Sequence, residues 1–248
     1  SPWDGCRLSW APGDSGFSRG PRPRAIGSGL RARTAPRRSF GLTLWAKVAE
    51  ERRRVAFELE GFTETQWSTP SLCDGWTVKA TAAHLTTTFH TSMPKFMLKV
   101  ITSGGFNRAN AKIAVAEASQ RSTSDIVDEL RANAEHRFTP PGLGPEAPLL
   151  DVVVHGRDIG RPLGLSWTLP PEVAEQVLDF LMTKKAKVVH PKGGIADLRF
   201  EATDINWSGG DGAVVSGPAE ALLMAVSGRP AALDDLSGDG LQEFTSRF

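Results

Sequence analysis

The sequence predicts an α+β protein in which a helical bundle precedes a smaller α+β domain. Apolar residues recur with helical spacing in several segments between residues 42 and 162. Residues 170–246 combine amphipathic segments with short runs that alternate like strands. Residues 1–41 show no lasting periodicity. We therefore divide the chain into an extension (1–41), a helical bundle (42–162) and a small α+β domain (170–246).

The composition is that of an ordinary globular protein. The chain has 248 residues, of which 40% are hydrophobic and 23% charged, and its mean hydropathy is −0.22. Its formal net charge is +1, but residues 1–40 contain eight Arg and two Asp, so the remainder is net acidic. This distribution gives no general case for nucleic acid as the main partner.

Cysteine content and hydropathy indicate where the protein resides. Cys6 and Cys73 are too few for a disulfide framework, which favours a reducing compartment. No apolar run approaches the roughly 20 residues that a bilayer span needs, and nothing near the start resembles a secretion signal. We expect a cytoplasmic protein that does not associate with membranes.

Residues 1–41 are rich in Gly, Pro, Ser and Arg. Such a segment buries too little apolar surface to offset the entropy lost on ordering, so we expect a disordered extension. An Arg-rich, acid-poor stretch is also typical of a targeting peptide or a nucleic-acid-binding arm. Loss of nucleic-acid binding on deletion of residues 1–40 would identify such an arm.

Three segments of the bundle have helical periodicity. Residues 44–59 form an amphipathic pattern that Gly61 ends. A second helix is expected over residues 77–101, and Pro94 should kink or interrupt it. Residues 108–137 look helical again, with a break and a cap near Ser122.

The C-terminal region contains different elements. A helix should begin at the prolines that open the segment PPEVAEQVLDFL. The segment LRFEATDINWSGGDGAVVSG (198–217) alternates like paired strands around a Gly-Gly-Asp-Gly turn. A short helix should then run from Pro218 to just before Gly228.

The segment LLDVVVHGRDI (149–159) places polar residues inside an apolar run. In a helix, Asp151, His155 and Asp158 form one stripe, with Cβ atoms about 6 Å apart at i,i+4, so that two of them could grip one metal ion. The valines favour a strand, in which Asp151 and His155 would be about 13 Å apart. An Asp–His hydrogen bond in the core is a further alternative.

A third ligand must come from elsewhere in the chain. His84 lies beside the apolar stripe of the second helix and has small neighbours that leave room for a ligand. His90 would lie about 120° around the same helix, so both cannot easily face one ion. His136 and His190 lie in polar surroundings and are expected to be solvated. A packed core histidine is the ordinary interpretation of His84 taken alone.

These residues lie in segments that resemble the mycothiol-dependent maleylpyruvate isomerase family, within the DinB-like metal-binding superfamily. The landmarks are WSTPSLCDGWTVKATAAHL (67–85), LLDVVVHGRDIGRPLG (149–164) and residues 207–241. The resemblance runs from about Leu44 to Leu241 and does not include residues 1–40. It implies a DinB-like four-helix bundle followed by a sterol-carrier-like α+β domain.

The resemblance also implies a metal site formed by His84, Asp151 and His155. The family has Glu where this chain has Asp151, whose side chain is one methylene shorter. Two imidazoles, a carboxylate and an open position suit zinc. The family reaction uses mycothiol as a cosubstrate, which implies a thiol- and metal-dependent isomerase or S-transferase acting on a small electrophilic carboxylate such as maleylpyruvate.

The sequence also indicates roles for three further residues. Arg229 is a candidate for holding a substrate carboxylate, because arginine suits bidentate recognition, although a surface arginine at a helix end is an equal alternative. Asp158 is a candidate hydrogen-bond partner for His155, or else an exposed acid. Cys73 is expected to be a small buried side chain rather than a nucleophile. The alternative to an enzyme is a non-catalytic metal- or ligand-binding module of the same fold.

Overall fold

The computed structural model describes residues 42–91, 93–140 and 142–248, so the predicted extension 1–41 lies outside the described residues. Seven helices form the first part of the described chain: α1 (Leu44–Glu60), α2 (Glu64–Ser68), α3 (Val78–His90), α4 (Met93–Ser103), α5 (Phe106–Gln120), α6 (Thr123–Ala132) and α7 (Glu146–Gly160). The second part contains η1 (Arg161–Leu163), α8 (Pro171–Leu181), η2 (Lys184–Val189), β1 (Leu198–Ala202), β2 (Ser208–Gly210), β3 (Ala213–Gly217), α9 (Ala219–Val226), η3 (Pro230–Asp235) and α10 (Leu241–Thr245).

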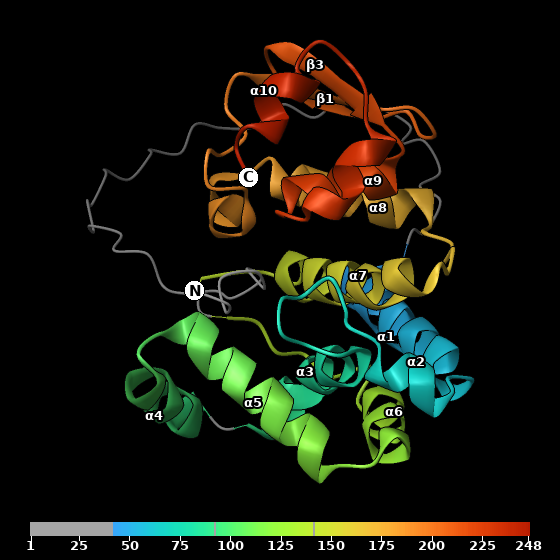
Figure 1. Ribbon diagram of the computed structural model, residues 1–248, viewed down its shortest axis with the longest axis vertical. Coiled ribbons are helices and arrows are strands. Elements are labelled where there is room, and N and C mark those ends of the chain that lie inside the picture. Colours follow the sequence, from blue (N-terminus) through green and yellow to red (C-terminus); the bar gives the residue numbers. More distant parts are fainter. Residues whose placement is uncertain (1–41, 92, 141) are drawn as a thin grey trace, which may run out of the picture.

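The two parts meet along α7 (Figure 1). In the helical part, α1 packs against α6 and α7, and α3 packs against α5, α6 and α7. On its other side, α7 contacts α8 and α9, which lie between it and the small sheet (Figure 1). Most buried apolar side chains form one continuous cluster that reaches from α1 to α10, so both parts share a core; a second, smaller cluster contains Cys73, Trp76, Ala80, Ala111 and Ala114. The predicted α+β fold class is confirmed.

The sequence placed two interruptions in the helical region, and both are present. The predicted helix over residues 77–101 is divided into α3 and α4, with Pro94 in the first turn of α4, where its missing N–H costs nothing. Between α5 and α6, the Ser122 side chain accepts from the backbone N–H of Asp125, whose carboxylate accepts from the N–H of Ser122. This capping box begins α6 as predicted.

The segment that could have been a strand is helix α7. Its leucines and valines are buried nearly all round, which explains the continuous apolar run in the sequence. Helices α1 and α3 cover one side, and α8 and α9 cover the other. Because a helix enclosed on all sides needs no polar face, its pattern resembles that of a buried strand.

The strands around the Gly-Gly-Asp-Gly turn differ from the expected hairpin. The sheet order is β2-β1-β3: β1 pairs antiparallel with β2 and parallel with β3, so the strands on either side of the turn do not pair with one another. Gly210 (φ +80°) and Gly212 (φ +133°) carry the chain across the start of β1. A Cβ at Gly212 would lie 2.0 Å from the carbonyl oxygen of Asp197. Glycine therefore permits a crossing here instead of a hairpin.

In the three described ranges, no helix combines the length and apolar character required of a bilayer span. The cytoplasmic location expected from the sequence stays a prediction.

Candidate metal centre

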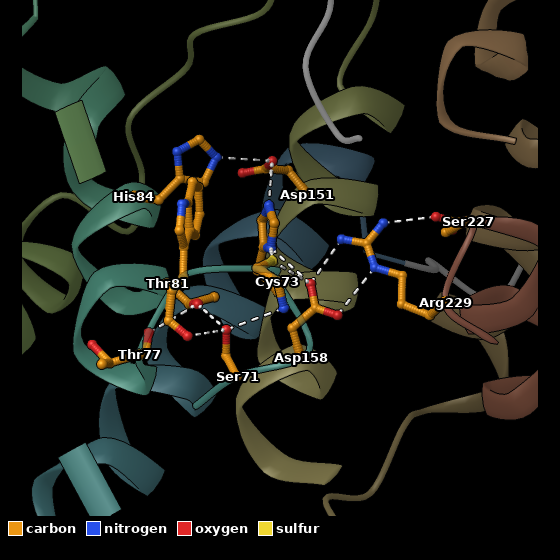
Figure 2. A network of polar contacts seen from close by, with 11 residues as sticks. Ser71, Cys73, Thr77, Thr81, His84, Asp151, Asp158, Ser227 and Arg229 are labelled. Atoms are coloured by element: carbon orange, nitrogen blue, oxygen red, sulfur yellow. Dashed lines mark hydrogen bonds and ion pairs between the residues drawn. The ribbon is translucent and has the colours of Figure 1, made fainter. Parts of the chain in front are cut away.

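Helices α3 and α7 bring together the three side chains that the sequence singled out. Nε2 of His84 lies 3.7 Å from Oδ1 of Asp151 (Figure 2). Nε2 of His155 lies 3.6 Å from the same oxygen. His84 belongs to α3, whereas Asp151 and His155 are one turn apart on α7. The predicted ligands converge, and metal binding by them stays a prediction.

Their spacing fits a divalent cation. One donor atom from each of the three residues lies within 4.8 Å of the other two. Tetrahedral zinc, with bonds of about 2.0–2.2 Å, holds its ligand atoms roughly 3.3–3.6 Å apart, close to the two distances above. Nε2 of His155 is buried and has no hydrogen-bond partner in the described part of the chain. A cation at this position would satisfy that atom.

Asp158 fixes the orientation of the His155 ring. Oδ2 of Asp158 lies 2.9 Å from Nδ1 of His155, and neither side chain is exposed. Because an ionised carboxylate can only accept, Nδ1 carries the hydrogen and donates it. The lone pair of the neutral imidazole is then on Nε2, which faces Asp151. The hydrogen bond proposed from the i,i+3 spacing is confirmed, and Asp158 is not an exposed acid.

Arg229 lies beside Asp158 and not at the surface. Its Nε donates to Oδ1 of Asp158 at 3.1 Å, and its Nη2 donates to Oδ2 at 2.8 Å (Figure 2). Nη1 donates to the carbonyl oxygen of Ser227 at 2.7 Å. The bidentate partner of this arginine is therefore an acid of its own chain, which makes the surface alternative wrong. A direct role in holding substrate stays a prediction.

Local sequence explains how Arg229 reaches α7. Gly228 adopts φ +80° just after α9, and its N–H donates to the carbonyl oxygen of Ala225. The N–H of Arg229 donates to the carbonyl oxygen of Met224, so both groups close the end of the helix. Pro230 then opens η3. The Ser-Gly-Arg-Pro segment thus combines a helix end with a sharp turn that directs the arginine inward.

Cys73 adjoins the same carboxylate. Its Sγ donates to Oδ2 of Asp158 at 3.2 Å and lies 3.6 Å from Nδ1 of His155. These three residues could form a second donor group for a metal. However, the Arg229 guanidinium already binds both oxygens of Asp158, and its positive charge opposes a cation there. Geometry therefore favours the site formed by His84, Asp151 and His155.

Trp76 forms a wall of the candidate site, a role that the sequence did not assign. Its ring centre is 5.2 Å from that of His84 and 6.1 Å from that of His155. The loop that carries Trp76 is bound to α7, because the N–H of Leu72 donates to the carbonyl oxygen of Asp158. Thr77 then caps α3 by accepting from the N–H of Ala80. The loop thus positions Cys73, Trp76 and the start of α3 together.

Arg52 of α1 is a second residue that the sequence did not assign. Its Nη1 donates to the carbonyl oxygens of Ala134 and His136 at 3.1 and 2.7 Å. Burial lowers the pKa of Arg52 to about 10, and the charge of Asp151 opposes that shift. Arg52 stays charged at neutral pH. Its position four residues after Val48, within the apolar stripe of α1, is the signal that could have revealed its burial.

The electrostatic surroundings favour ionised Asp151 and neutral His155. Burial raises the pKa of Asp151, but its contacts with His84 and His155 and the charge of Arg52 outweigh it and lower the pKa. Burial lowers the pKa of His155, although the hydrogen bond with Asp158 opposes that shift. An ionised carboxylate and a neutral imidazole are the forms that bind metal ions.

The remaining histidines lie away from this cluster. His90 lies between Glu129 and Glu117, with its ring nitrogens 3.0 and 3.3 Å from their carboxylate oxygens. His190 is buried, with Nε2 2.8 Å from the carbonyl oxygen of Leu181, so the expectation that it is solvated was wrong. The helix end at Leu181 leaves a carbonyl group that the imidazole satisfies. His136 is partly buried, with its ring 5.3 Å from that of Phe89.

Family models match nearly all of the described chain. The model described as the mycothiol maleylpyruvate isomerase N-terminal domain matches residues 48–160, and that of the C-terminal domain of the same family matches residues 168–245. The chain belongs to the mycothiol-dependent maleylpyruvate isomerase family. The resemblance identified from the sequence segments is therefore confirmed.

Two solved structures similar to this chain are members of that family. A crystal structure of the mycothiol-dependent maleylpyruvate isomerase is 14% identical and covers 80% of this chain and 93% of its own, with a TM-score of 0.45. A histidine-to-alanine mutant of the same enzyme has the same identity and coverage, with a TM-score of 0.44. Among curated proteins, none matches significantly.

Proposed function

We propose that this chain is a metal-dependent enzyme that uses a low-molecular-weight thiol, mycothiol, either to isomerise a small electrophilic carboxylate such as maleylpyruvate or to transfer the thiol sulfur to it. The observation that supports it best is the convergence of His84, Asp151 and His155 around the buried Nε2 of His155, which has no hydrogen-bond partner among the described residues. Family membership supports the thiol and the substrate class.

The donor set favours zinc, which binds two imidazoles and a carboxylate readily and leaves a fourth position open. When bound, such a cation lowers the pKa of a thiol in that position, so that thiolate is available at neutral pH. Ionised Asp151 would supply negative charge, and His84 and His155 would each supply a ring nitrogen as donor. The ring of Trp76 lies beside both imidazoles.

The reaction follows from the chemistry of an activated cis double bond. Addition of the thiol sulfur to one carbon, with a proton to the other, converts the double bond to a single bond. Rotation and loss of the same thiol then give the trans isomer. With an electrophile that keeps the sulfur, the same first step would be an S-transfer. The chain needs no cysteine of its own as nucleophile, which agrees with the burial of Cys73.

Metal analysis tests the site directly. The wild-type protein should bind close to one zinc per chain, and His84→Ala and His155→Ala should each lose most of it. His90→Ala is the matched control, because His90 lies on the same helix as His84 but contacts Glu117 and Glu129 instead. Equal metal content in all four proteins would overturn the site assignment.

Activity is tested separately on metal-loaded protein. Mycothiol-dependent isomerisation of maleylpyruvate, followed beside a panel of other electrophiles, should depend on both thiol and metal. Metal binding without turnover of any electrophile would instead favour the non-catalytic binding module.

A further inference from the structure

A continuous series of buried polar contacts joins the α+β domain to one predicted metal ligand. Arg229 binds both oxygens of Asp158, and Oδ2 of Asp158 lies 2.9 Å from Nδ1 of His155. The exposed fractions of the Arg229 and Asp158 side chains are 2% and 0%. Arg229 follows α9, whereas Asp158 and His155 belong to α7. The side chains that make these contacts are therefore almost completely buried.

Asp158, the middle residue of this series, affects how His155 can bind a metal ion. A carboxylate that accepts the Nδ1 hydrogen of a histidine fixes its tautomer and ring orientation and makes Nε2 a stronger donor. A buried carboxylate performs this role only while it is ionised, and burial opposes ionisation. The Arg229 guanidinium, with two hydrogen bonds to that carboxylate, compensates the cost.

We propose that Arg229 is a positioning residue of the metal centre, which acts through Asp158 to hold His155 ready to bind a cation. The α+β domain thereby controls the metal affinity of a site whose three ligands all lie in the helical part. This inference rests on the proposed metal site. It assigns Arg229 a function that requires no contact with substrate.

The chain contains a matched control for the joining of the two parts. Arg161, at the end of α7, binds Glu220 of α9 through Nε at 2.9 Å and Asp235 of η3 through Nη1 at 2.8 Å. This second ion-pair cluster also links α7 to the α+β domain. Among the described residues, its hydrogen bonds reach none of the three predicted ligands. Removing Arg161 therefore weakens the domain contact without disturbing His155.

The test measures zinc affinity of the full chain by competition with a chromophoric chelator, together with the visible absorption spectrum of bound cobalt(II). The variants are Arg229→Met, Asp158→Asn, the double variant and Arg161→Met, with Arg229→Lys as a rescue variant that restores charge. Arg229→Met and Asp158→Asn should each lower zinc affinity by about 10- to 100-fold and alter the cobalt spectrum. Arg161→Met should leave both unchanged, and Arg229→Lys should recover part of the loss.

The double variant decides whether Arg229 acts through Asp158. If it does, adding Arg229→Met to Asp158→Asn causes little further loss of affinity. Should Arg229→Met alone fail to fold, as judged by circular dichroism, the comparison between Asp158→Asn and the double variant still decides. An additional loss as large as that in the wild-type background would overturn the proposal, as would wild-type affinity in Arg229→Met or an equal loss in Arg161→Met. A wild-type protein that binds no zinc would instead overturn the proposed metal site itself, and this inference with it.

Discussion

Arg229 and Asp158 form a bidentate ion pair across the contact between α7 and the α+β domain, and 71 residues separate them in the sequence. Both side chains are buried, so each charge is stabilised by the other and not by solvent. Removing one partner leaves the other as an uncompensated buried charge.

Breaking this pair should destabilise the fold. We expect Arg229→Met to lower the free energy of unfolding by about 3–5 kcal/mol, measured by urea denaturation of metal-free protein. Arg161→Met should cost about 1 kcal/mol or less, because its pairs with Glu220 and Asp235 are partly exposed. Similar losses in the two variants would contradict the assignment of a buried, mutually dependent pair.

Stability should fall on acidification below about pH 4. Burial raises the pKa of Asp158, but the charge of Arg229 and the hydrogen bond from His155 outweigh it and hold that pKa well below its usual range. The unfolded chain, with an Asp pKa of about 3.9, therefore binds more protons than the folded chain as the pH falls. The stability difference between wild type and Asp158→Asn, measured in EDTA, should shrink below about pH 4. A constant difference down to pH 2.5 would count against this.

Buried histidines should produce an earlier loss of stability. Burial lowers the pKa of both His155 and His190. The unfolded chain, with a histidine pKa of about 6.5, then takes up protons before the folded chain does, so stability declines as the pH falls below about 6.5. His190→Gln should show a smaller decline between pH 7.5 and 5 than wild type in urea titrations. An unchanged slope would mean that His190 binds its proton equally well in the folded and the unfolded chain.

Cys73 should prove dispensable as a nucleophile. Its side chain is 1% exposed, so iodoacetamide should label the native protein slowly and the urea-unfolded protein rapidly, as quantified by mass spectrometry. We expect Cys73→Ala to retain thiol-dependent turnover, because the proposed reaction takes its sulfur from the cosubstrate. Complete loss of turnover in a folded, metal-loaded Cys73→Ala protein would argue for a direct chemical role.

The strand crossing can be tested at Gly212. Alanine there would require both φ +133° and a Cβ 2.0 Å from the carbonyl oxygen of Asp197, so we expect Gly212→Ala to cost well over 1 kcal/mol in thermal unfolding. Gly164→Ala is the control, because Gly164 has φ +66° but no atom near its Cβ position. It should cost about 1 kcal/mol. Equal effects would indicate that the chain does not cross β1 closely at this point.

Local patterns predicted the features that depend on neighbours in sequence. Caps and breaks at Ser122 and Pro94 follow from side chains within one turn. The same holds for the stripe of Asp151, His155 and Asp158, once α7 is known to be a helix. That choice could not be made from propensity, because enclosure by four other helices removed the polar face that normally distinguishes a helix.

Features that depend on contacts between residues far apart in the chain could not be predicted from the sequence. No spacing rule indicates that Arg229 would meet Asp158, or that Arg52 would reach two carbonyl groups more than 80 residues away. The alternation in residues 198–217 predicted strands correctly, but pairing depends on where β1 lies between β2 and β3. Long-range contacts of this kind follow from the packed fold and not from local pattern.

The position of α7 between the two parts matters to anyone who would transplant this centre into another protein. If His84, Asp151, His155 and Asp158 were grafted onto a simpler bundle, the Asp158 carboxylate would be buried without a counter-charge, because Arg229 lies outside the bundle. The smallest unit that could be transferred is therefore α3 and α7 together with the Ser-Gly-Arg-Pro turn that follows α9.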